Sequence, residues 1–533
     1  MSGATLRHYD VAIVGAGPVG SLCALAHARK GARVVLLEAN PKASKRLAGE
    51  WLHPPAARML RDFGIALDTQ SRSTTGQGFT VFPEDGSEPI VLPYPDGAHS
   101  LVCEHAALVS HLREAVENES GVDFLLHARV QAVEDGRVTF TRNGVDESVT
   151  AARIVGADGR TSVVRQSLDL STSPIICSWM VGVTLRGVSL PLEGYGHVLC
   201  GGPGPILVYR LAEHCVRVIV DVPVDRWTPR DRIGFLSDSY AGVLPETLRS
   251  AFVEALRTEQ FQIANNALRP RVTYGSPRRV LIGDAAGHYH PLTAVGMTLG
   301  FGDALTLAEG EDFHDFTTKR VQATRAPEFL AMGFYEVFAD HRAEVVAVRH
   351  AVYRRWRAKS AVRDRTMCLL ACEDTSVAHL SREFGVTVAR AVAREMPRSS
   401  DQLAWRRAGA SVQALAVRLW WLLRGVRQLH KARSAGGGKD ERVRDALARA
   451  FPVSMPSSVR DPQPSRPREV APPEAGPALR RASVRLLHLQ GEDGAWEGEM
   501  VWCPMLTAQY VLLHHILERP LEPGRRRRVL RSF

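Results

Sequence analysis

The chain has 533 residues, of which 45% are hydrophobic and 23% are charged, a composition typical of a globular protein with several domains. Lys and Arg exceed Asp and Glu by 67 to 57, but no nucleic-acid-binding motif is present, so we expect no nucleic-acid partner. The eight cysteines show no CxxC or metal-ligand spacing, which excludes a disulfide scaffold, predicts no metal site and favours the cytoplasm. No apolar run resembles a signal peptide or reaches the roughly 18–20 residues of a membrane span.

Residues 10–38 predict a strand, a glycine turn, a helix and a second strand. Within the turn, Gly15 permits a sharp bend, Gly17 lets the backbone approach a pyrophosphate, and Gly20 lets the helix pack closely on the strand. The helix directs free N–H groups at the phosphates. Glu38 ends the second strand, where its carboxylate can accept hydrogen bonds from ribose hydroxyls. The segment therefore predicts a dinucleotide site, without deciding between FAD and NAD.

Two later segments each place an aspartate at the end of a predicted strand. Asp158 and Gly159 lie in VGADGR, and Gly283 and Asp284 lie in LIGDAA. Such an aspartate can bond a ribityl or ribose hydroxyl, although either segment alone could be only a capped turn. In this order behind the first strands, the two segments resemble flavoprotein monooxygenases of the para-hydroxybenzoate hydroxylase type. That resemblance implies FAD as the cofactor, with chemistry carried by the flavin and no certain catalytic side chain.

Three further motifs resemble segments of squalene epoxidases, in the same order along the chain. They are RLAGEWLHP at 46–54, similar to RIVGELLQP, LPYP at 92–95, and HPLTAVGMT at 290–298, similar to HPLTGGGMT. The resemblance implies that Arg46 contacts the flavin side of the cofactor and that Gly296 and Met297 contact the isoalloxazine. Gly296 is also predicted to begin a helix, whose N–H groups would stabilise negative charge on reduced flavin. For the substrate pocket we expect Phe79, Tyr94, Pro291 and Leu292.

The chain also departs from the squalene epoxidase pattern. Phe79 stands where the family tends to have Tyr, and no Arg is present at Glu104–Ala107, just before the next predicted helix. The loop at 290–298 lacks two of the family's three consecutive glycines. The chain has no WxWxIP segment, which argues against a flavin halogenase.

The resemblance implies a monooxygenase that transfers one oxygen atom of O₂, through a flavin C4a-hydroperoxide, to squalene or a related isoprenoid alkene. Such a pocket must be apolar and dry. No second dinucleotide fingerprint is present, so we expect NAD(P)H to be the ultimate electron donor through a separate reductase as redox partner. The alternatives are a flavoprotein hydroxylase of an aromatic or polyketide substrate, a reductase of isoprenoid double bonds resembling geranylgeranyl reductases, and a non-catalytic flavin-binding fusion.

The expected fold is α/β, with a Rossmann-like FAD-binding domain, an interleaved β-rich substrate domain and a C-terminal helical region. The FAD-binding domain is expected at 8–70, 106–165 and 270–320, the substrate domain at 71–105 and 166–269, the helical region at 321–450, a Pro-rich linker at 451–480 and a partial terpene-cyclase-like segment at 481–533.

Residues 401–433 combine seven Arg and Lys and a single acidic residue with Trp405, Trp420 and Trp421. A basic, Trp-bearing amphipathic helix suits an anionic membrane surface, although the same helix could pack on the flavin domain. We favour the membrane, and therefore a peripheral location on its inner face.

The last part of the chain differs in composition and motifs from the part before it. Residues 452–477 contain eight prolines, which predicts a linker. Beyond it, Gln490, Gly494 and Trp496 fit the QxxxGxW repeat of squalene-hopene and oxidosqualene cyclases. The segment resembles the start of those enzymes, but the chain has no DxDD acid motif, so we expect no cyclisation.

Overall fold

The computed structural model describes residues 7–43, 47, 49–65, 73–170, 174–227, 231–258, 260–310 and 312–395, which lie in one compact unit. Arg46, the segment 401–433, the Pro-rich linker and the segment 481–533 lie outside the described residues. The structural predictions made for them stay predictions.

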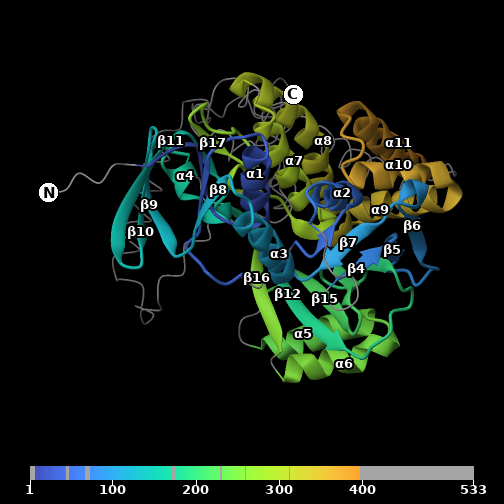
Figure 1. Ribbon diagram of the computed structural model, residues 1–533. Helices are drawn as coiled ribbons and strands as arrows, with labels where there is room; N and C mark the ends of the chain where they lie inside the picture. Colours follow the sequence, from blue (N-terminus) through green and yellow to red (C-terminus); the bar gives the residue numbers. More distant parts are fainter. Residues whose placement is uncertain are drawn as a thin grey trace, which may run out of the picture. The chain divides into compact units, whose positions relative to one another are not determined.

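The first seven-stranded sheet is built around the predicted strand–helix–strand segment (Figure 1). Its strands are, in spatial order, β8 (Val122–Leu125), β2 (Val34–Leu37), β1 (His8–Val14), β11 (Val145–Gly156), β10 (Arg137–Arg142) and β9 (Ala128–Glu134), and β17 (Arg279–Leu281) also pairs with β11. β1 runs parallel to both of its neighbours, β2 and β11. Their carboxyl ends therefore meet at one edge of the sheet, where Gly15, Glu38 and Ala157 follow them, the usual place for a ligand in such sheets.

Helix α1 (Pro18–Ala28) connects β1 to β2 and packs between α3 (His105–Glu117) and α7 (Gly296–Ala308) (Figure 1). All of its residues except Val19 are buried. This burial on every side explains why the helix carries small and apolar side chains and no Asp, Glu, Lys or Arg.

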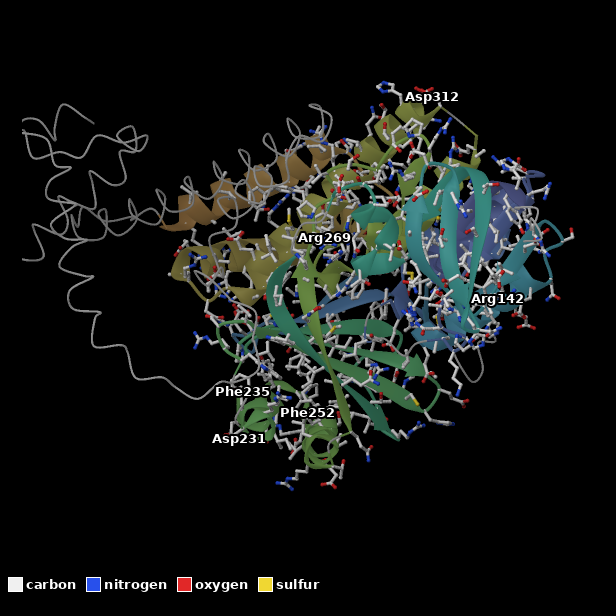
Figure 2. The ribbon with its side chains drawn as sticks, turned by 90° about the vertical axis from the view of Figure 1, so that its left-hand side faces the viewer. Arg142, Asp231, Phe235, Phe252, Arg269 and Asp312 are labelled. Carbon is white, nitrogen blue, oxygen red and sulfur yellow. The ribbon has the colours of Figure 1, made fainter. Side chains whose placement is uncertain are left out.

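The second seven-stranded sheet combines two segments that are far apart in the sequence. Its strands are, in spatial order, β16 (Phe261–Leu268), β12 (Ile175–Arg186), β15 (Cys215–Pro223), β14 (Ile206–Ala212), β13 (Tyr195–Leu199), β5 (Gly78–Phe82) and β6 (Ile90–Pro93). One face is covered by α5 (Arg232–Tyr240) and α6 (Glu246–Arg257), at the bottom of Figure 1, and Phe252 of α6 is fully buried against it (Figure 2). The other face carries Phe79 and Tyr209, which pack together with Trp51 in a separate core.

The segment 71–105 divides between two sheets. β5 and β6 join the second sheet, whereas β4 (Ser73–Gly76) and β7 (Ser100–Cys103) form a three-stranded sheet with β3 (Trp51–Leu52). Trp51 and Leu52 belong to the motif at 46–54, so this small sheet joins that motif to the predicted substrate segment.

Helices follow the sheets along the chain. They are α8 (Phe313–Ala339), α9 (Ala343–Ala358), α10 (Ser360–Leu370) and α11 (Val377–Glu395), while two shorter helices, α2 (Pro54–Asp62) and α4 (Val163–Gln166), lie earlier in the chain. Asp312, at the top of Figure 2, caps α8 by accepting a hydrogen bond from the His314 N–H. Within the described ranges, no helix is both long enough and apolar enough to cross a bilayer.

Candidate functional site

A cavity of about 1010 Å³ is lined by both seven-stranded sheets and by the start of α7. Predicted site residues that line it are Gly15, Gly17, Glu38, Phe79, Asp158, Gly159, Asp284, Pro291, Leu292, Gly296 and Met297. Gly20, Gly283 and Tyr94 do not line it, and Arg46 lies outside the described residues.

The three glycines of GAGPVG meet different surroundings. Gly15 has a φ of +99°, and a Cβ on it would lie 2.7 Å from the Ala157 carbonyl oxygen. A Cβ on Gly20 would lie 1.9 Å from the Gly15 carbonyl oxygen, so only glycine lets α1 approach this closely. Gly17 has open space where its Cβ would be, and as N-cap of α1 it offers no capping side chain. The first N–H groups of α1 can therefore receive an anion from the cavity.

Glu38 is held by the loop that follows β1. Its Oε2 accepts a hydrogen bond from the Ala16 N–H at 2.8 Å, and its Oε1 accepts one from the Asn40 N–H at 2.8 Å. The Arg113 guanidinium lies 3.1 Å from the same Oε2 and also donates to the Ala16 carbonyl at 2.9 Å. Glu38 thus fixes the loop as well as facing the cavity.

Sequence reasoning missed Arg113, which lines the cavity although it is only 9% exposed. The chain has no Arg at Glu104–Ala107, but α3 supplies one about two turns later. The sequence did contain a sign of this role, because Arg113 shares a helix face with Val109, Leu112 and Val116. A charged residue on an apolar helix face requires a partner.

The two predicted aspartates have different settings. Asp158 Oδ2 accepts a hydrogen bond from the Val163 N–H, the first of α4, at 2.6 Å, while its Oδ1 is buried without a hydrogen-bond partner among the described residues. Burial raises the pKa of Asp158, against the effect of its hydrogen bonds with Ser162 and the local backbone. Asp284 is about one-third exposed, with its Oδ2 3.5 Å from Nε of Arg160. Asp284 therefore offers a more accessible carboxylate to a ligand than Asp158.

A network of buried ion pairs holds the turn at Gly283 in place. Asp303 of α7 is fully buried and accepts hydrogen bonds from the Gly283 N–H at 3.0 Å, from Nε of Arg320 at 2.8 Å and from Arg271. Nε of Arg271 also lies 3.2 Å from the Glu328 carboxylate. The network ties the turn that carries Asp284 to the helix that carries Gly296.

Helix α7 begins at Gly296, as the sequence predicted, and no side chain caps its first turn. Gly296 and Met297 line the cavity, so the N–H groups of this turn can stabilise negative charge there. Just before the helix, Ala294 adopts a left-handed conformation with a φ of +52°. This is one of the two positions where the chain lacks the glycine of the squalene epoxidase motif, and it therefore carries backbone strain.

One wall of the cavity is aromatic and apolar. Trp51 packs against Phe79 with ring centroids 4.8 Å apart and against Tyr209 at 5.8 Å, and Met180 and Leu292 also line this part. Tyr94 lies behind this wall, where its hydroxyl accepts a hydrogen bond from Trp51 Nε1 at 3.0 Å and bonds His53 Nδ1 at 2.7 Å. The predicted pocket residue Tyr94 therefore orients Trp51 instead of lining the cavity.

Glu50 is a charged residue beside this otherwise apolar wall. Its carboxylate, only 2% exposed, accepts two hydrogen bonds from Arg217, at 2.9 and 2.7 Å, and one from the Tyr209 hydroxyl at 2.8 Å. Burial raises the pKa of Glu50, and the bonds to Arg217 and Tyr209 oppose that shift. Because Arg217 lies on β15, the ion pair joins the motif at 46–54 to the second sheet.

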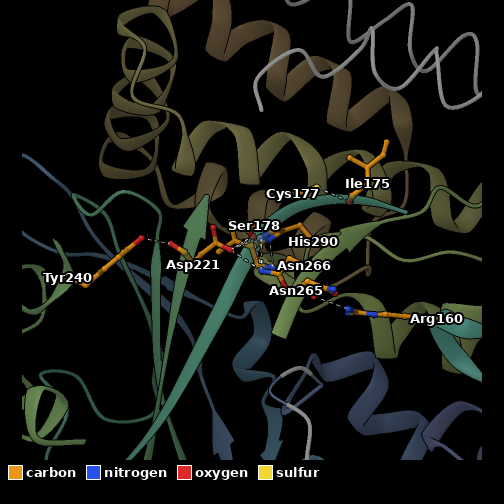
Figure 3. Close-up of polar contacts among 10 residues, drawn as sticks. Arg160, Ile175, Cys177, Ser178, Asp221, Tyr240, Asn265, Asn266 and His290 are labelled. Carbon is orange, nitrogen blue, oxygen red and sulfur yellow. Dashed lines mark hydrogen bonds and ion pairs between the residues drawn. The ribbon is translucent and has the colours of Figure 1, made fainter. Parts of the chain in front are cut away.

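A polar cluster holds the loop before α7 (Figure 3). Asp221 Oδ2 accepts hydrogen bonds from Ser178 Oγ at 2.6 Å and Asn266 Nδ2 at 3.0 Å, and it lies 2.9 Å from His290 Nε2. The Leu292 N–H donates to His290 Nδ1 at 3.2 Å, so in a neutral ring Nε2 carries the proton and donates to Asp221. The Tyr335 ring stacks on His290 with centroids 3.8 Å apart, which fixes its plane.

The cavity fits FAD. Its two helix N-termini suit the pyrophosphate and the negative edge of a flavin, and buried polar atoms such as Asp158 Oδ1 have no hydrogen-bond partner among the residues that the structure describes. No group of His, Cys, Asp and Glu that could hold a metal ion is found in the part of the chain that the structure describes.

The parallel central strands β2, β1 and β11 carry the glycine turn, and a mostly antiparallel second sheet joins them over one cavity. This arrangement is that of an FAD-dependent monooxygenase. The FAD binding domain family matches residues 8–310, and the chain belongs to that family. Residues 479–533 match the squalene-hopene cyclase N-terminal domain, as the QxxxGxW motif predicted.

Curated relatives agree with this assignment. Squalene epoxidase of Aspergillus fumigatus is 29% identical over 384 residues, covering 65% of this chain and 79% of that protein. Squalene epoxidase of Candida albicans is 27% identical over 416 residues, covering 65% and 83%. Among solved structures, p-nitrophenol 4-monooxygenase of Pseudomonas putida has a similar fold, with a TM-score of 0.59 and 19% identity over 69% of this chain and 99% of that one. The chain is therefore an FAD-dependent monooxygenase with squalene epoxidase homologues.

Proposed function

We propose that the chain inserts one oxygen atom from O₂ into a double bond of squalene or a related isoprenoid. The single observation that carries this proposal is the aromatic and apolar wall of Trp51, Phe79 and Tyr209, which lines the same cavity as the first turn of α7. A hydrocarbon alkene offers no group for a hydrogen bond, so shape and dryness have to position it. The names of the curated relatives support the same substrate class.

The proposed cofactor ligands are those predicted from the sequence, with Arg113 added. They are Gly15, Gly17, Gly20, Glu38, Arg46, Arg113, Asp158, Gly159, Gly283, Asp284, Gly296 and Met297, among which Gly20 and Gly283 act through backbone packing. We also propose that 8–70, 106–165 and 270–320 bind FAD and that 71–105 and 166–269 bind the substrate.

The bound FAD would activate O₂ with electrons that we propose come from NAD(P)H through a separate reductase. The residues of this chain would hold the flavin and the substrate in position and keep water away from them. The N–H groups of Gly296 and Met297 hold negative charge at the flavin, while Trp51 and Phe79 exclude water from the reacting alkene. Arg217 neutralises Glu50, so the wall presents no uncompensated charge to an apolar substrate.

The test is turnover of squalene by the full chain with FAD, NADPH and a flavoprotein reductase under ¹⁸O₂. The expected product is squalene plus one ¹⁸O atom, measured by mass spectrometry together with O₂ consumption. Product without ¹⁸O, or O₂ consumption without any oxygenated product from squalene and shorter isoprenoids, contradicts the proposal. A saturated product formed without O₂ would instead identify a reductase.

One observation favours a second candidate, a hydroxylase of a phenolic or polyketide substrate. Asn266 lines the cavity, and its Oδ1 is buried without a hydrogen-bond partner in the described ranges, so it could accept a hydrogen bond from a substrate hydroxyl. The same assay with para-nitrophenol and other phenols separates the two candidates.

We propose further that residues 401–433 bind an anionic membrane surface. Flotation of the full chain with vesicles tests this. Binding to phosphatidylglycerol vesicles but not to phosphatidylcholine vesicles is expected, with loss of binding when Trp420 and Trp421 are replaced by Ala. Equal flotation with both vesicle types, or with neither, contradicts it.

A further inference from the structure

The structure contains a second cavity to which the proposed function gives no role. It has a volume of about 450 Å³ and is lined by the ends of β12, β15 and β16 and by the C-terminal end of α8. Its aliphatic lining residues are Ile175, Ile176, Pro203, Pro223, Leu268, Met332 and Ala339. A cavity of this size, with a mostly apolar lining and a few polar groups, is typical of a small-molecule site.

The lining of the second cavity differs from the aromatic wall of the first. None of its lining residues in the described ranges is Trp or Phe, and the ring of Tyr335 is stacked on His290. A molecule in this cavity therefore contacts mainly aliphatic side chains, which suits an aliphatic ligand better than a flat aromatic one.

The charged residues at the second cavity compensate one another. Nε of Arg342 donates hydrogen bonds to Oδ1 and Oδ2 of Asp340, at 3.1 and 2.9 Å. Nε of Arg226 lies 3.9 Å from the Asp225 carboxylate. Each arginine of the described lining therefore has a carboxylate beside it, so the cavity attracts a neutral ligand better than a carboxylate or a phosphate.

Glu336 supplies a polar group inside the cavity. Burial raises the pKa of its carboxyl group to about 7, an effect that Asp340 increases and Arg342 opposes. Near neutral pH both forms are populated, and the protonated form can donate a hydrogen bond whereas the ionised form only accepts. A hydroxyl group both donates and accepts, so it can bond to either form of Glu336.

The second cavity adjoins the polar cluster that holds the loop before α7. His290 lines both cavities, and Tyr335, which stacks on it, lines the second one. The Tyr335 hydroxyl donates a hydrogen bond to Asp221. Cys177 of the lining directly precedes Ser178 of the cluster on β12 (Figure 3). A ligand in the second cavity therefore contacts side chains that position a loop of the first.

We propose that the second cavity binds a neutral aliphatic alcohol, and that this alcohol is an effector of the flavin site. Its chain packs against the aliphatic lining, its hydroxyl group bonds to Glu336, and its presence acts on the flavin site through Tyr335 and His290. The inference does not depend on which substrate is oxidised in the first cavity. A negative squalene assay therefore leaves it unaffected.

Equilibrium dialysis of labelled alcohols against the full-length holoprotein tests the site. The probes are farnesol, a branched isoprenoid alcohol, and dodecan-1-ol, a straight-chain one. Saturable binding of either supports the proposal, and the tighter probe tells the two sources apart. Binding of neither overturns it.

Two matched substitutions locate the bound alcohol. Ala339→Trp places a large side chain in the second cavity and is expected to weaken binding there roughly tenfold or more. Ala264→Trp makes the same change in the first cavity and is expected to leave this binding unchanged. Binding that is lost in Ala264→Trp and kept in Ala339→Trp belongs to the first cavity and overturns the proposal.

Recognition of the hydroxyl group is tested separately, so the proposal stays falsifiable if Ala339→Trp does not fold. The wild type is expected to bind farnesol roughly tenfold more tightly than farnesene, a hydrocarbon of the same length, whereas Glu336→Leu should bind both about equally. Glu336→Gln keeps a donor and an acceptor and should keep the preference. Equal binding of farnesol and farnesene by the wild type overturns the proposal, as does tighter binding of farnesoic acid, which carries a carboxylate.

The effector role is measured through the flavin absorption spectrum of the holoprotein. In the wild type, the bound alcohol is expected to change this spectrum with the same midpoint concentration as in dialysis. In Ala339→Trp, the same concentration should leave the spectrum unchanged. Binding to the wild type without any spectral change overturns the effector role.

Discussion

The two sides of the cavity are built in different ways. The cofactor side uses backbone N–H groups and glycines at the carboxyl ends of parallel strands, supported from behind by buried ion pairs such as Asp303 with Arg320. The substrate side uses large side chains, such as Trp51 and Phe79, on and beside an antiparallel sheet. A site that binds its cofactor through backbone N–H groups requires glycines at fixed spacings, whereas an apolar wall requires only large hydrophobic side chains. The cofactor side is therefore much easier to recognise in a sequence.

If buried charges support the cofactor side, Asp303→Ala should have the largest effect. It leaves the Arg271 and Arg320 guanidiniums buried without their main acceptor and is expected to lower the free energy of unfolding by about 3–5 kcal/mol. Urea unfolding measures the change. Asp312→Ala, which removes only a helix cap, should cost about 1 kcal/mol, and equal effects of the two variants would contradict a special role for the network.

On the substrate side, the burial of His53 should make the free energy of unfolding depend on pH. Burial lowers the pKa of His53 to about 4, below the ordinary 6.5 of an unfolded histidine. Between these values the unfolded chain binds more protons, so stability contributed by neutral His53 is present above pH 6.5 and falls by about 3 kcal/mol as the pH falls to 4. Urea unfolding across this range should show a flatter profile for His53→Asn, while replacing the exposed His214 should change little. An unchanged profile in His53→Asn refutes the expectation.

The backbone character of the cofactor side is tested by adding a single methyl group. Gly17→Ala should leave the stability of the flavin-free protein within about 0.5 kcal/mol, because no atom lies within 4 Å of the new Cβ. FAD affinity should fall roughly tenfold or more, because the methyl group separates the backbone from the pyrophosphate. Gly20→Ala should reverse this pattern and lose stability first, since its Cβ overlaps the Gly15 carbonyl. Wild-type FAD affinity in Gly17→Ala would contradict the role of Gly17.

The smallest expected effect lies where the two sides meet. Ala294→Gly should raise the free energy of unfolding by about 0.5–1 kcal/mol, because glycine adopts a φ of +52° without strain. Ala304→Gly, inside α7, is the matched control and should lower it by about 1 kcal/mol. Thermal unfolding of both variants gives the comparison, and destabilisation by both would exclude strain at Ala294.

The sequence by itself determined the parts of the protein that depend on local geometry. GAGPVG, Glu38 at the end of a strand and the start of α7 at Gly296 follow from neighbouring residues and lie where the motifs predict. The motif resemblances likewise led to the FAD binding domain family and to the cyclase-like last segment.

Only the tertiary structure decided which distant side chains meet. Arg113 reaches Glu38 from α3, His290 meets Asp221 across 69 residues, and the place of Tyr94 behind Trp51 depends on a sheet that no local pattern reveals. The physical reason is that turn and cap geometry is a property of a few consecutive residues, while packing and buried hydrogen bonds depend on partners brought together only by the folded sheets.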